Sequence, residues 1–230
     1  MARGVEPTML KSGQSVEHPL NSEGVWCQIL KRPAPGRPAL FLDRDGALVQ
    51  ETGYLHRAKD IRVIPGAAKV IVAANQRSVP VIMVTNQSGI GRGYYGWSEF
   101  KSVQDAIIAL LAADGATIDA IYACAHHPEA EGVLAHPNHP ARKPNPGMLL
   151  QAASDLALDL KSSWLVGDKA DDIEAAMRAG IAGALHVATG HGGSERQLAE
   201  RLANSNFEVR FGQSIADAMT LPILMPPHGA

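Results

Sequence analysis

The chain has few cysteines, few aromatic residues and no marked excess of charge of either sign. Of its 230 residues, two are cysteines (Cys27 and Cys124) and 5% are aromatic, and the formal net charge is −2. With so few cysteines, a disulfide framework is not expected. The 21 lysines and arginines are scattered along the chain, which argues against a nucleic-acid partner.

Long hydrophobic runs are also missing. No apolar run approaches the roughly 18 residues that a membrane-spanning helix needs. The N-terminal segment lacks the apolar stretch of a secretory signal. These absences predict a cytoplasmic protein without a membrane partner. The hydrophobic fraction of 46% still allows a sizeable buried core.

The chain divides into three parts by composition. Residues 1–37 are rich in proline, glycine, serine and charge, and we expect an N-terminal extension that is mostly loop. Residues 38–222 alternate apolar runs with helical periods, which is typical of one folded domain. Residues 223–230 form a short tail.

Strands and helices are expected to alternate within the domain. Strands are predicted at 39–42, 79–84, 118–123, 163–166, 184–187 and 207–210. Helices are predicted at 65–77, 97–113, 146–158, 171–179 and 195–203. This alternation indicates an α/β fold, a parallel sheet with helices on both faces. In such folds ligands bind beyond the carboxyl ends of the strands.

Polar side chains follow several of these expected strands. FLDRDG places Asp43 and Asp45 after the first strand, VTNQSG places Thr85 after the second, and VGDK places Asp168 after the fourth. Lys143 precedes the helix that leads into the fourth strand. Turns favour such residues in any case, but the full set at one edge of a sheet indicates a functional site.

These residue types fit phosphoryl transfer. Clustered carboxylates supply the oxygen ligands that Mg²⁺ prefers, and a carboxylate can also attack phosphorus and form an aspartyl-phosphate. The phosphoryl oxygens need fixed donors such as a lysine, a hydroxyl and backbone N–H groups. A second carboxyl group can protonate the leaving alkoxide and later activate water.

Four segments, FLDRDG, VTNQSG, RKPNPG and VGDKADD, resemble motifs I to IV of the haloacid dehalogenase (HAD) superfamily. Within it, TNQSGIGRG, CAHHP and RKPNPGML resemble the D-glycero-D-manno-heptose-1,7-bisphosphate phosphatases, siblings of the histidinol-phosphate phosphatase domain. The resemblance covers about 39–187. It implies a HAD-like Rossmannoid sheet and a Mg²⁺-dependent phosphatase that acts on a small phosphosugar through an aspartyl-phosphate.

The resemblance also implies roles for individual residues. Asp43 is expected to be the nucleophile and Asp45 the general acid and base, while Thr85 and Lys143 hold the phosphoryl group. Mg²⁺ is expected on the carboxylates of Asp43 and Asp168 and on the backbone carbonyl of Asp45. Substrate contacts are expected from Glu51, Thr52, Gly53, Tyr54, Asn86, Gln87, Ser88, Arg142 and Lys169.

Three further expectations concern the surroundings of the site. Asp172 should support Lys143 or a metal-bound water. Arg92, Arg142 and Lys169 could hold a second phosphate, which favours a bisphosphate substrate. The segments between the motifs leave no room for an inserted cap domain, so we expect a capless core. The only expected partner is a small phosphorylated substrate, and the chain is expected to be monomeric.

A possible zinc site is less well defined. The heptose phosphatases carry a Cys-x-His … Cys-x-Cys zinc loop, and Cys124, His126 and His139 match three of its ligands. Ala141 falls on the fourth position, where His136 could substitute. Two alternatives remain: a structural zinc site with these four ligands, or a polar surface loop without metal.

Motif I also departs from the usual pattern, Asp-x-Asp-Gly-Thr, because Ala47 replaces the threonine. This substitution and the incomplete zinc pattern motivate the last of three hypotheses. The first is a heptose bisphosphate phosphatase. The second is a histidinol-phosphate or other small-molecule phosphatase. The third, of another class, is a weakly active HAD-fold module that binds phosphate for regulation.

Overall fold

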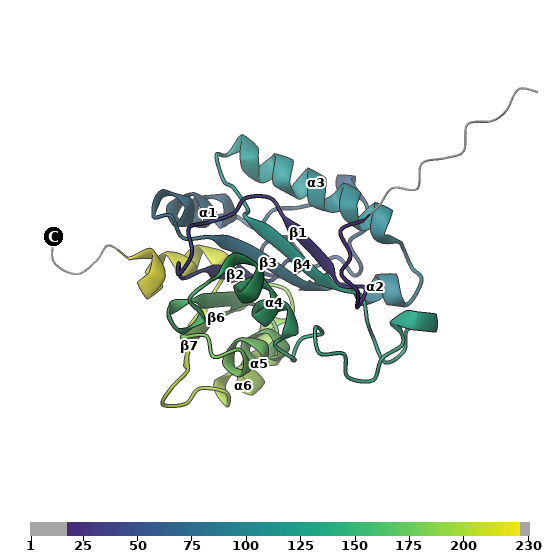
Figure 1. The fold of residues 1–230 in the computed structure, drawn as a ribbon. Coiled ribbons are helices and arrows are strands. Elements are labelled where there is room, and N and C mark those ends of the chain that lie inside the picture. The colour runs from purple at the N-terminus through teal and green to yellow at the C-terminus, as the bar shows by residue number, and fades with distance from the viewer. Residues whose placement is uncertain (1–17, 226–230) are drawn as a thin grey trace, which may run out of the picture.

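The computed structural model describes residues 18–225, so residues 1–17 of the predicted extension and 226–230 of the predicted tail lie outside the described residues. One sheet runs through the molecule (Figure 1). Its strands are β1 (Trp26–Ile29), β2 (Leu40–Leu42), β3 (Val81–Asn86), β4 (Ala120–Cys124), β5 (Trp164–Gly167), β6 (Gly183–Val187) and β7 (Glu208–Gly212).

Six α-helices and five short 3-10 helices complete the described part of the chain. The α-helices are α1 (Ala67–Gln76), α2 (Ser88–Gly91), α3 (Trp97–Ala113), α4 (Gly147–Leu156), α5 (Ala170–Arg178) and α6 (Gly192–Glu200). The 3-10 helices are η1 (Ala58–Asp60), η2 (Gly132–Leu134), η3 (Leu160–Ser162), η4 (Ile215–Thr220) and η5 (Pro222–Leu224).

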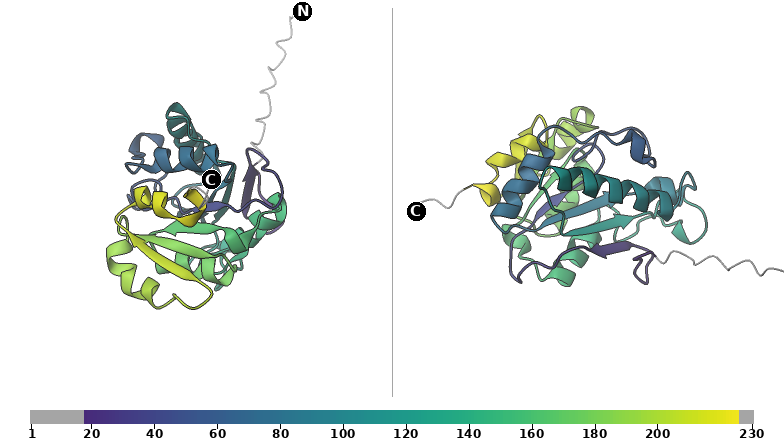
Figure 2. Two further views of the ribbon diagram at one scale, coloured as in Figure 1. Left: turned by 90° about the vertical axis from the view of Figure 1, so that its left-hand side faces the viewer. Right: turned by 90° about the horizontal axis from the view of Figure 1, so that it is seen from above.

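The strand order is β1-β4-β3-β2-β5-β6-β7, and every neighbouring pair except β1 with β4 is parallel. Helices α1 and α3 lie on one face of the sheet, and α4, α5 and α6 on the other (Figures 1 and 2). Helix η4 packs beside α1. This arrangement confirms the predicted α/β fold with helices on both faces.

The core follows from the alternation of side chains along each strand. In β2, Leu40 and Leu42 pack in the hydrophobic cluster that includes α1 and α3. Phe41 packs in the second cluster, with residues of α4 and α5. Because both faces of these strands are buried, they read in the sequence as continuous apolar runs. Their carboxyl ends meet at one edge, where polar groups can gather.

Strand β1 is a short regular element within the predicted N-terminal extension. It pairs antiparallel with β4 at the edge of the sheet. Trp26 is fully buried, stacked on Trp97 with ring centroids 5.5 Å apart and edge-on to Phe100 at 5.1 Å. A four-residue strand in a segment rich in proline and glycine carries little local signal, and its pairing depends on a distant partner.

The segments between the site-bearing strands hold only core elements. Helices η1 and α1 lie between β2 and β3, while α2, α3, β4 and η2 lie between β3 and α4. Within residues 18–225, no inserted domain covers the strand ends, in agreement with the predicted capless core. In the same range, the helices are too short or too polar for any of them to cross a membrane.

The buried position of Trp26 predicts that β1 stabilises the domain. Trp26→Ala removes a large core side chain and should lower the free energy of unfolding by about 3–5 kcal/mol. Tyr94→Ala, which truncates a largely exposed ring, is the matched control and should cost about 0.5 kcal/mol or less. Urea unfolding measures both values, and an equally small cost for both variants would show that β1 is peripheral.

Candidate active site

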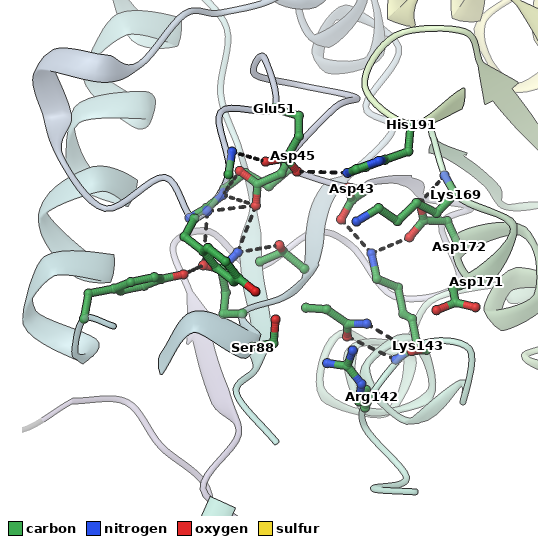
Figure 3. Close-up of a pocket in the computed structure, with 17 residues that line it drawn as sticks. Asp43, Asp45, Glu51, Ser88, Arg142, Lys143, Lys169, Asp171, Asp172 and His191 are labelled. Atoms are coloured by element: carbon green, nitrogen blue, oxygen red, sulfur yellow. Dashed lines mark hydrogen bonds and ion pairs between the residues drawn. The ribbon is translucent and has the colours of Figure 1, made fainter. Parts of the chain in front are cut away.

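A pocket of about 390 Å³ opens at the carboxyl ends of β2, β3 and β5 (Figure 3). Most of the residues predicted from the motifs contribute to its wall. The lining residues are Asp43, Arg44, Asp45, Glu51, Gly53, Tyr54, Thr85, Asn86, Gln87, Ser88, Tyr95, Arg142, Lys143, Lys169, Asp171, Asp172 and His191. Segments far apart in the sequence thus meet where the sequence analysis expects a site.

A buried lysine is the centre of the charged cluster. Lys143 Nζ donates to Asp43 Oδ1 at 2.6 Å and to the carbonyl oxygen of Val84 at 2.9 Å. It also forms an ion pair with Asp172 Oδ1 at 2.6 Å. Figure 3 shows the ammonium group between the two carboxylates. The expected support of Lys143 by Asp172 is therefore present in the structure.

Three buried carboxylates converge beside this lysine. Ligand oxygens of Asp43, Asp168 and Asp172 all lie within 4.8 Å of one another. Asp43 follows β2, Asp168 follows β5, and Asp172 lies in the first turn of α5. Since Lys143 provides one positive charge at the centre of three acidic groups, the cluster has the composition of a cation site.

Burial shifts the protonation of this cluster. It raises the pKa of Asp43 well above its usual value, although Lys143 opposes the shift. Burial, followed by repulsion from Asp172, raises the pKa of Asp168 to about 7. Burial disfavours the charge of Lys143, but attraction to Asp172 and Asp43 outweighs this effect and raises the pKa of Lys143.

Mg²⁺ fits the donor set that these residues present. Within the described residues, the buried oxygen Oδ1 of Asp168 has no hydrogen-bond partner, and such an orphaned acceptor is costly unless a ligand satisfies it. Carboxylate oxygens are the ligand type that Mg²⁺ takes in proteins. Asp43 and Asp168, two of the predicted ligands, are therefore placed to hold the ion together.

The second aspartate of motif I is held by an arginine that the sequence analysis did not single out. Arg44 is buried, and its Nη2 donates to Asp45 Oδ2 at 2.8 Å. Gln87 Nε2 donates to the same oxygen at 3.0 Å and to Thr85 Oγ1 at 2.9 Å. A buried guanidinium needs hydrogen-bond acceptors or an opposite charge. The presence of an arginine between Asp43 and Asp45, directly after a buried strand, could therefore have indicated the contact between Arg44 and Asp45.

The predicted substrate residues divide into two groups by their contacts. Gln87 is almost fully buried, and its Oε1 accepts from Tyr95 and Arg44 at 2.7 and 3.1 Å. Asn86 exchanges two hydrogen bonds with the backbone of Lys143, at 3.0 and 3.1 Å. Both amides therefore position catalytic candidates. The other lining residues of the predicted set are Glu51, Gly53, Tyr54, Ser88, Arg142 and Lys169.

Two predicted contacts lie elsewhere. Thr52 does not line this pocket but an adjacent depression. Arg92 is also absent from the pocket wall: it pairs with Glu129 at 2.9 Å and donates to the Tyr54 hydroxyl at 3.1 Å. Of the three basic residues expected to hold a second phosphate, the pocket thus retains Arg142 and Lys169.

His191, which lies after β6, is a pocket residue outside the set predicted from the sequence. Its side chain lines the pocket beside Glu51, with Nε2 3.8 Å from Glu51 Oε2 (Figure 3). Its backbone N–H donates to Asp168 Oδ2 at 2.7 Å. The rule that ligands bind beyond strand ends applies to the strand predicted at 184–187 as well, and could have drawn attention to this turn.

The Cys/His residues cluster without converging on one point. The rings of His126 and His139 stack with centroids 3.7 Å apart, and the ring of His136 lies 5.1 Å from that of His139. Cys124 Sγ is 3.9 Å from His139 Nδ1. Among the described residues, the carboxylate cluster above is the group whose ligand atoms converge, and these four residues are not part of it.

Ala47, the departure in motif I, packs in the hydrophobic core and is fully buried. It does not line the pocket. The three polar residues of motif I that line the pocket, Asp43, Arg44 and Asp45, are all present. The substitution therefore removes no group from the pocket wall.

The raised pKa of Asp168 predicts how the effect of Mg²⁺ on stability varies with pH. Without a cation, burial and repulsion from Asp172 raise the pKa of Asp168 to about 7 in the folded chain, against about 3.9 for an aspartate in the unfolded chain. Its contribution to stability is present below about pH 4 and is lost as the pH rises through about 7. Because Mg²⁺ binds the ionised carboxylate, its addition should raise the melting temperature more at about pH 8 than at about pH 5.

Asp168→Asn is the control for this experiment, because an amide does not titrate and is a weaker ligand. In this variant the Mg²⁺-dependent rise should be small at both pH values. Differential scanning fluorimetry measures all four conditions. An equal rise for the unaltered chain at both pH values would contradict the assignment of Asp168 as an ion ligand with a raised pKa.

Comparison with known proteins agrees with this geometry. A family model described as HAD-hydrolase-like matches residues 140–208. The chain is 47% identical, over 72% of its length and 77% of the relative, to a D-glycero-β-D-manno-heptose-1,7-bisphosphate 7-phosphatase from Mesorhizobium japonicum. It is 43% identical, over 62% of its length and 76% of the relative, to the corresponding α-anomer phosphatase from Burkholderia mallei.

Solved structures give the same relationship. A HAD-like phosphatase from Mesorhizobium loti aligns with a TM-score of 0.73 and 40% identity, covering 83% of this chain and all of that one. The D,D-heptose 1,7-bisphosphate phosphatase from B. bronchiseptica, solved with magnesium and phosphate, aligns with a TM-score of 0.67 and 30% identity, covering 78% and 94%. The chain therefore belongs to the heptose-1,7-bisphosphate 7-phosphatase family of HAD-like hydrolases.

Proposed function

We propose that this chain removes the 7-phosphate of D-glycero-D-manno-heptose 1,7-bisphosphate in a Mg²⁺-dependent reaction. The observation that carries the proposal is the buried cluster of Asp43, Asp168 and Asp172 around Lys143. It stands in a chain that is 47% identical to a phosphatase named for this reaction. The magnesium and phosphate in the related B. bronchiseptica structure support the same ion and the same type of ligand.

Asp43 is the proposed nucleophile. One of its carboxylate oxygens attacks the phosphorus, and the bond from phosphorus to the sugar oxygen breaks. Lys143, which already contacts Asp43 Oδ1, then lies beside the transferring group and can neutralise its charge. The carboxylates of Asp43 and Asp168 and the backbone carbonyl of Asp45 would hold Mg²⁺, whose charge stabilises the phosphoryl oxygens.

Asp45 and Thr85 complete the reaction. Asp45 gives its proton to the leaving sugar oxygen, then takes one from the water that attacks the aspartyl-phosphate. Inorganic phosphate leaves, and Asp43 is restored. Gln87 supports both residues, since its amide donates to Asp45 Oδ2 and to Thr85 Oγ1. Because Thr85 Oγ1 accepts from Gln87, its own hydrogen is available for a phosphoryl oxygen.

The second phosphate of the substrate is assigned to the basic side of the pocket. Arg142 and Lys169 line the wall, and Glu51 and Tyr54, in the loop after β2, are assigned to the sugar. Two cations beyond the reacting phosphate favour a bisphosphate over histidinol phosphate, which carries one phosphate. The complete set of catalytic candidates around one pocket favours an enzyme over a weakly active regulatory module.

Phosphate release from a substrate panel tests the proposal. The panel contains both anomers of heptose 1,7-bisphosphate, histidinol phosphate, fructose 1,6-bisphosphate and p-nitrophenyl phosphate, each with Mg²⁺. We expect kcat/KM for one heptose anomer to exceed every non-heptose value by at least about tenfold, a difference of about 1.4 kcal/mol. A higher value for histidinol phosphate would overturn the substrate assignment, and no turnover on any compound would favour the regulatory module.

Two variants test the assigned roles on the preferred substrate. Asp43→Asn should reduce turnover to background, because an amide cannot form the aspartyl-phosphate. Asp45→Asn should lower kcat by about 10²–10⁴-fold, the usual contribution of a general acid. Circular dichroism checks that both variants fold. Turnover by Asp43→Asn above background would refute the nucleophile, and a near-normal rate for Asp45→Asn would point to a different proton donor.

Zinc at Cys124, His126, His136 and His139 stays a hypothesis. One thiol and three imidazoles are ligand types that zinc takes. Two of the imidazoles, however, already accept backbone N–H groups through Nδ1: His139 from Ala141 and His136 from Asn138. These bonds also explain how the loop could keep its shape without metal. Elemental analysis of the purified chain distinguishes the two alternatives. The monomeric state and the cytoplasmic location stay predictions as well.

A further inference from the structure

The turn between β6 and α6 contacts the active site from a segment outside the four motifs. Thr189 Oγ1 donates to the carbonyl oxygen of Gly46 at 2.6 Å. Two residues later, the backbone N–H of His191 donates to Asp168 Oδ2 at 2.7 Å. A single short turn thus holds both the loop of motif I and the carboxylate of motif IV.

Two glycines enclose the same carboxylate oxygen. A Cβ atom built on Gly46 would stand 2.2 Å from Asp168 Oδ2, and one built on Gly190 would stand at the same distance from it. Both residues have positive φ, +88° and +59°, a conformation that glycine adopts without strain. Glycine is therefore required at both positions for two reasons. The backbone has a positive φ, and any side chain would collide with Asp168 Oδ2.

The consequence is a different environment for each oxygen of Asp168. Oδ2 is fixed by the N–H of His191 and packed between Gly46 and Gly190. Oδ1 is buried without a hydrogen-bond partner among the described residues, and Asp168 belongs to the converging group with Asp43 and Asp172. Fixing one oxygen sets the rotation of the carboxylate, and with it the position of the other.

We propose that the turn Thr189–Gly190–His191 positions Asp168 for Mg²⁺ and, through Gly46, aligns it with motif I. This inference rests on the proposed Mg²⁺-dependent function. Mg²⁺ demands near-ideal octahedral geometry, so a ligand that rotates freely would bind it poorly. Partners that orient metal ligands typically change affinity by about 10–100-fold when they are altered.

The test measures Mg²⁺ affinity of the whole chain by isothermal titration calorimetry, with the metal alone and no substrate. Gly190→Ala forces a methyl group against Asp168 Oδ2 and should weaken binding by about 10–100-fold. Thr189→Val keeps the shape but loses the hydroxyl, and should weaken binding by about two- to tenfold. Thr189→Ser keeps the donor and should bind within about twofold of the unaltered chain.

Thr220→Val is the matched control. Thr220 Oγ1 also donates to a backbone carbonyl, that of Asp217, at 2.8 Å, but Thr220 does not line the pocket. This variant should lose a similar hydrogen bond and keep its Mg²⁺ affinity. Melting temperatures without metal show how much of each change is general destabilisation.

A second readout separates positioning from a merely structural role. Measured at saturating Mg²⁺, the KM of Thr189→Val for the sugar phosphate should equal that of the unaltered chain. In a separate titration with Mg²⁺, the concentration that gives half of the maximal rate should be higher for this variant. Unchanged Mg²⁺ affinity in both Thr189→Val and Gly190→Ala would overturn this inference and leave the proposed function intact. An unaltered chain that binds no Mg²⁺ would overturn the proposed function and this inference together.

Discussion

The buried contact between Lys143 and the carboxylates of Asp43 and Asp172 is the interaction on which the site depends. Taking ionised groups out of water costs several kcal/mol each, and only close pairing offsets that cost. Here the pairing is incomplete, since Asp168 shares the same buried region and burial raises its pKa to about 7. The excess of negative charge favours binding of a cation in the cluster. The same cation would offset the repulsion between the three carboxylates and an anionic phosphoryl group that approaches them.

The fold supplies this cluster through the geometry of a parallel sheet. Because β2, β3 and β5 end at one edge, the residues after them meet in one pocket. The remaining polar contacts restrict how these residues move. Arg44 and Gln87 hold the carboxylate of Asp45, Asn86 holds the backbone of Lys143, and the turn after β6 holds Asp168. Preorganised groups of this kind are the main source of electrostatic catalysis.

Much of this could be predicted from the sequence, because apolar runs mark the buried strands and polar residues at their ends stand out. Six of the seven strands and five of the six α-helices in the described part of the chain follow from that contrast, and so do the polar residues at the strand ends, whereas the roles expected of those residues come from the resemblance. Contacts between distant segments could not be predicted in this way. The pairing of β1 with β4, the partners of Arg44 and the approach of Gly190 to Asp168 all depend on the folded chain. Arg92 is a further example, since its charge suggested that it could hold a phosphate, whereas in the folded chain it lies outside the pocket wall and pairs with Glu129.

The proposed mechanism requires Asp43 to become phosphorylated during turnover. Rapid mixing with heptose 1,7-bisphosphate and Mg²⁺, followed by an acid quench and peptide mass spectrometry, tests it most directly, because acid preserves an acyl phosphate. We expect a transient phosphoryl adduct on the peptide that contains Asp43, and none in Asp43→Asn. Rapid release of phosphate with an adduct on another residue, or with no adduct at any time point, would contradict it.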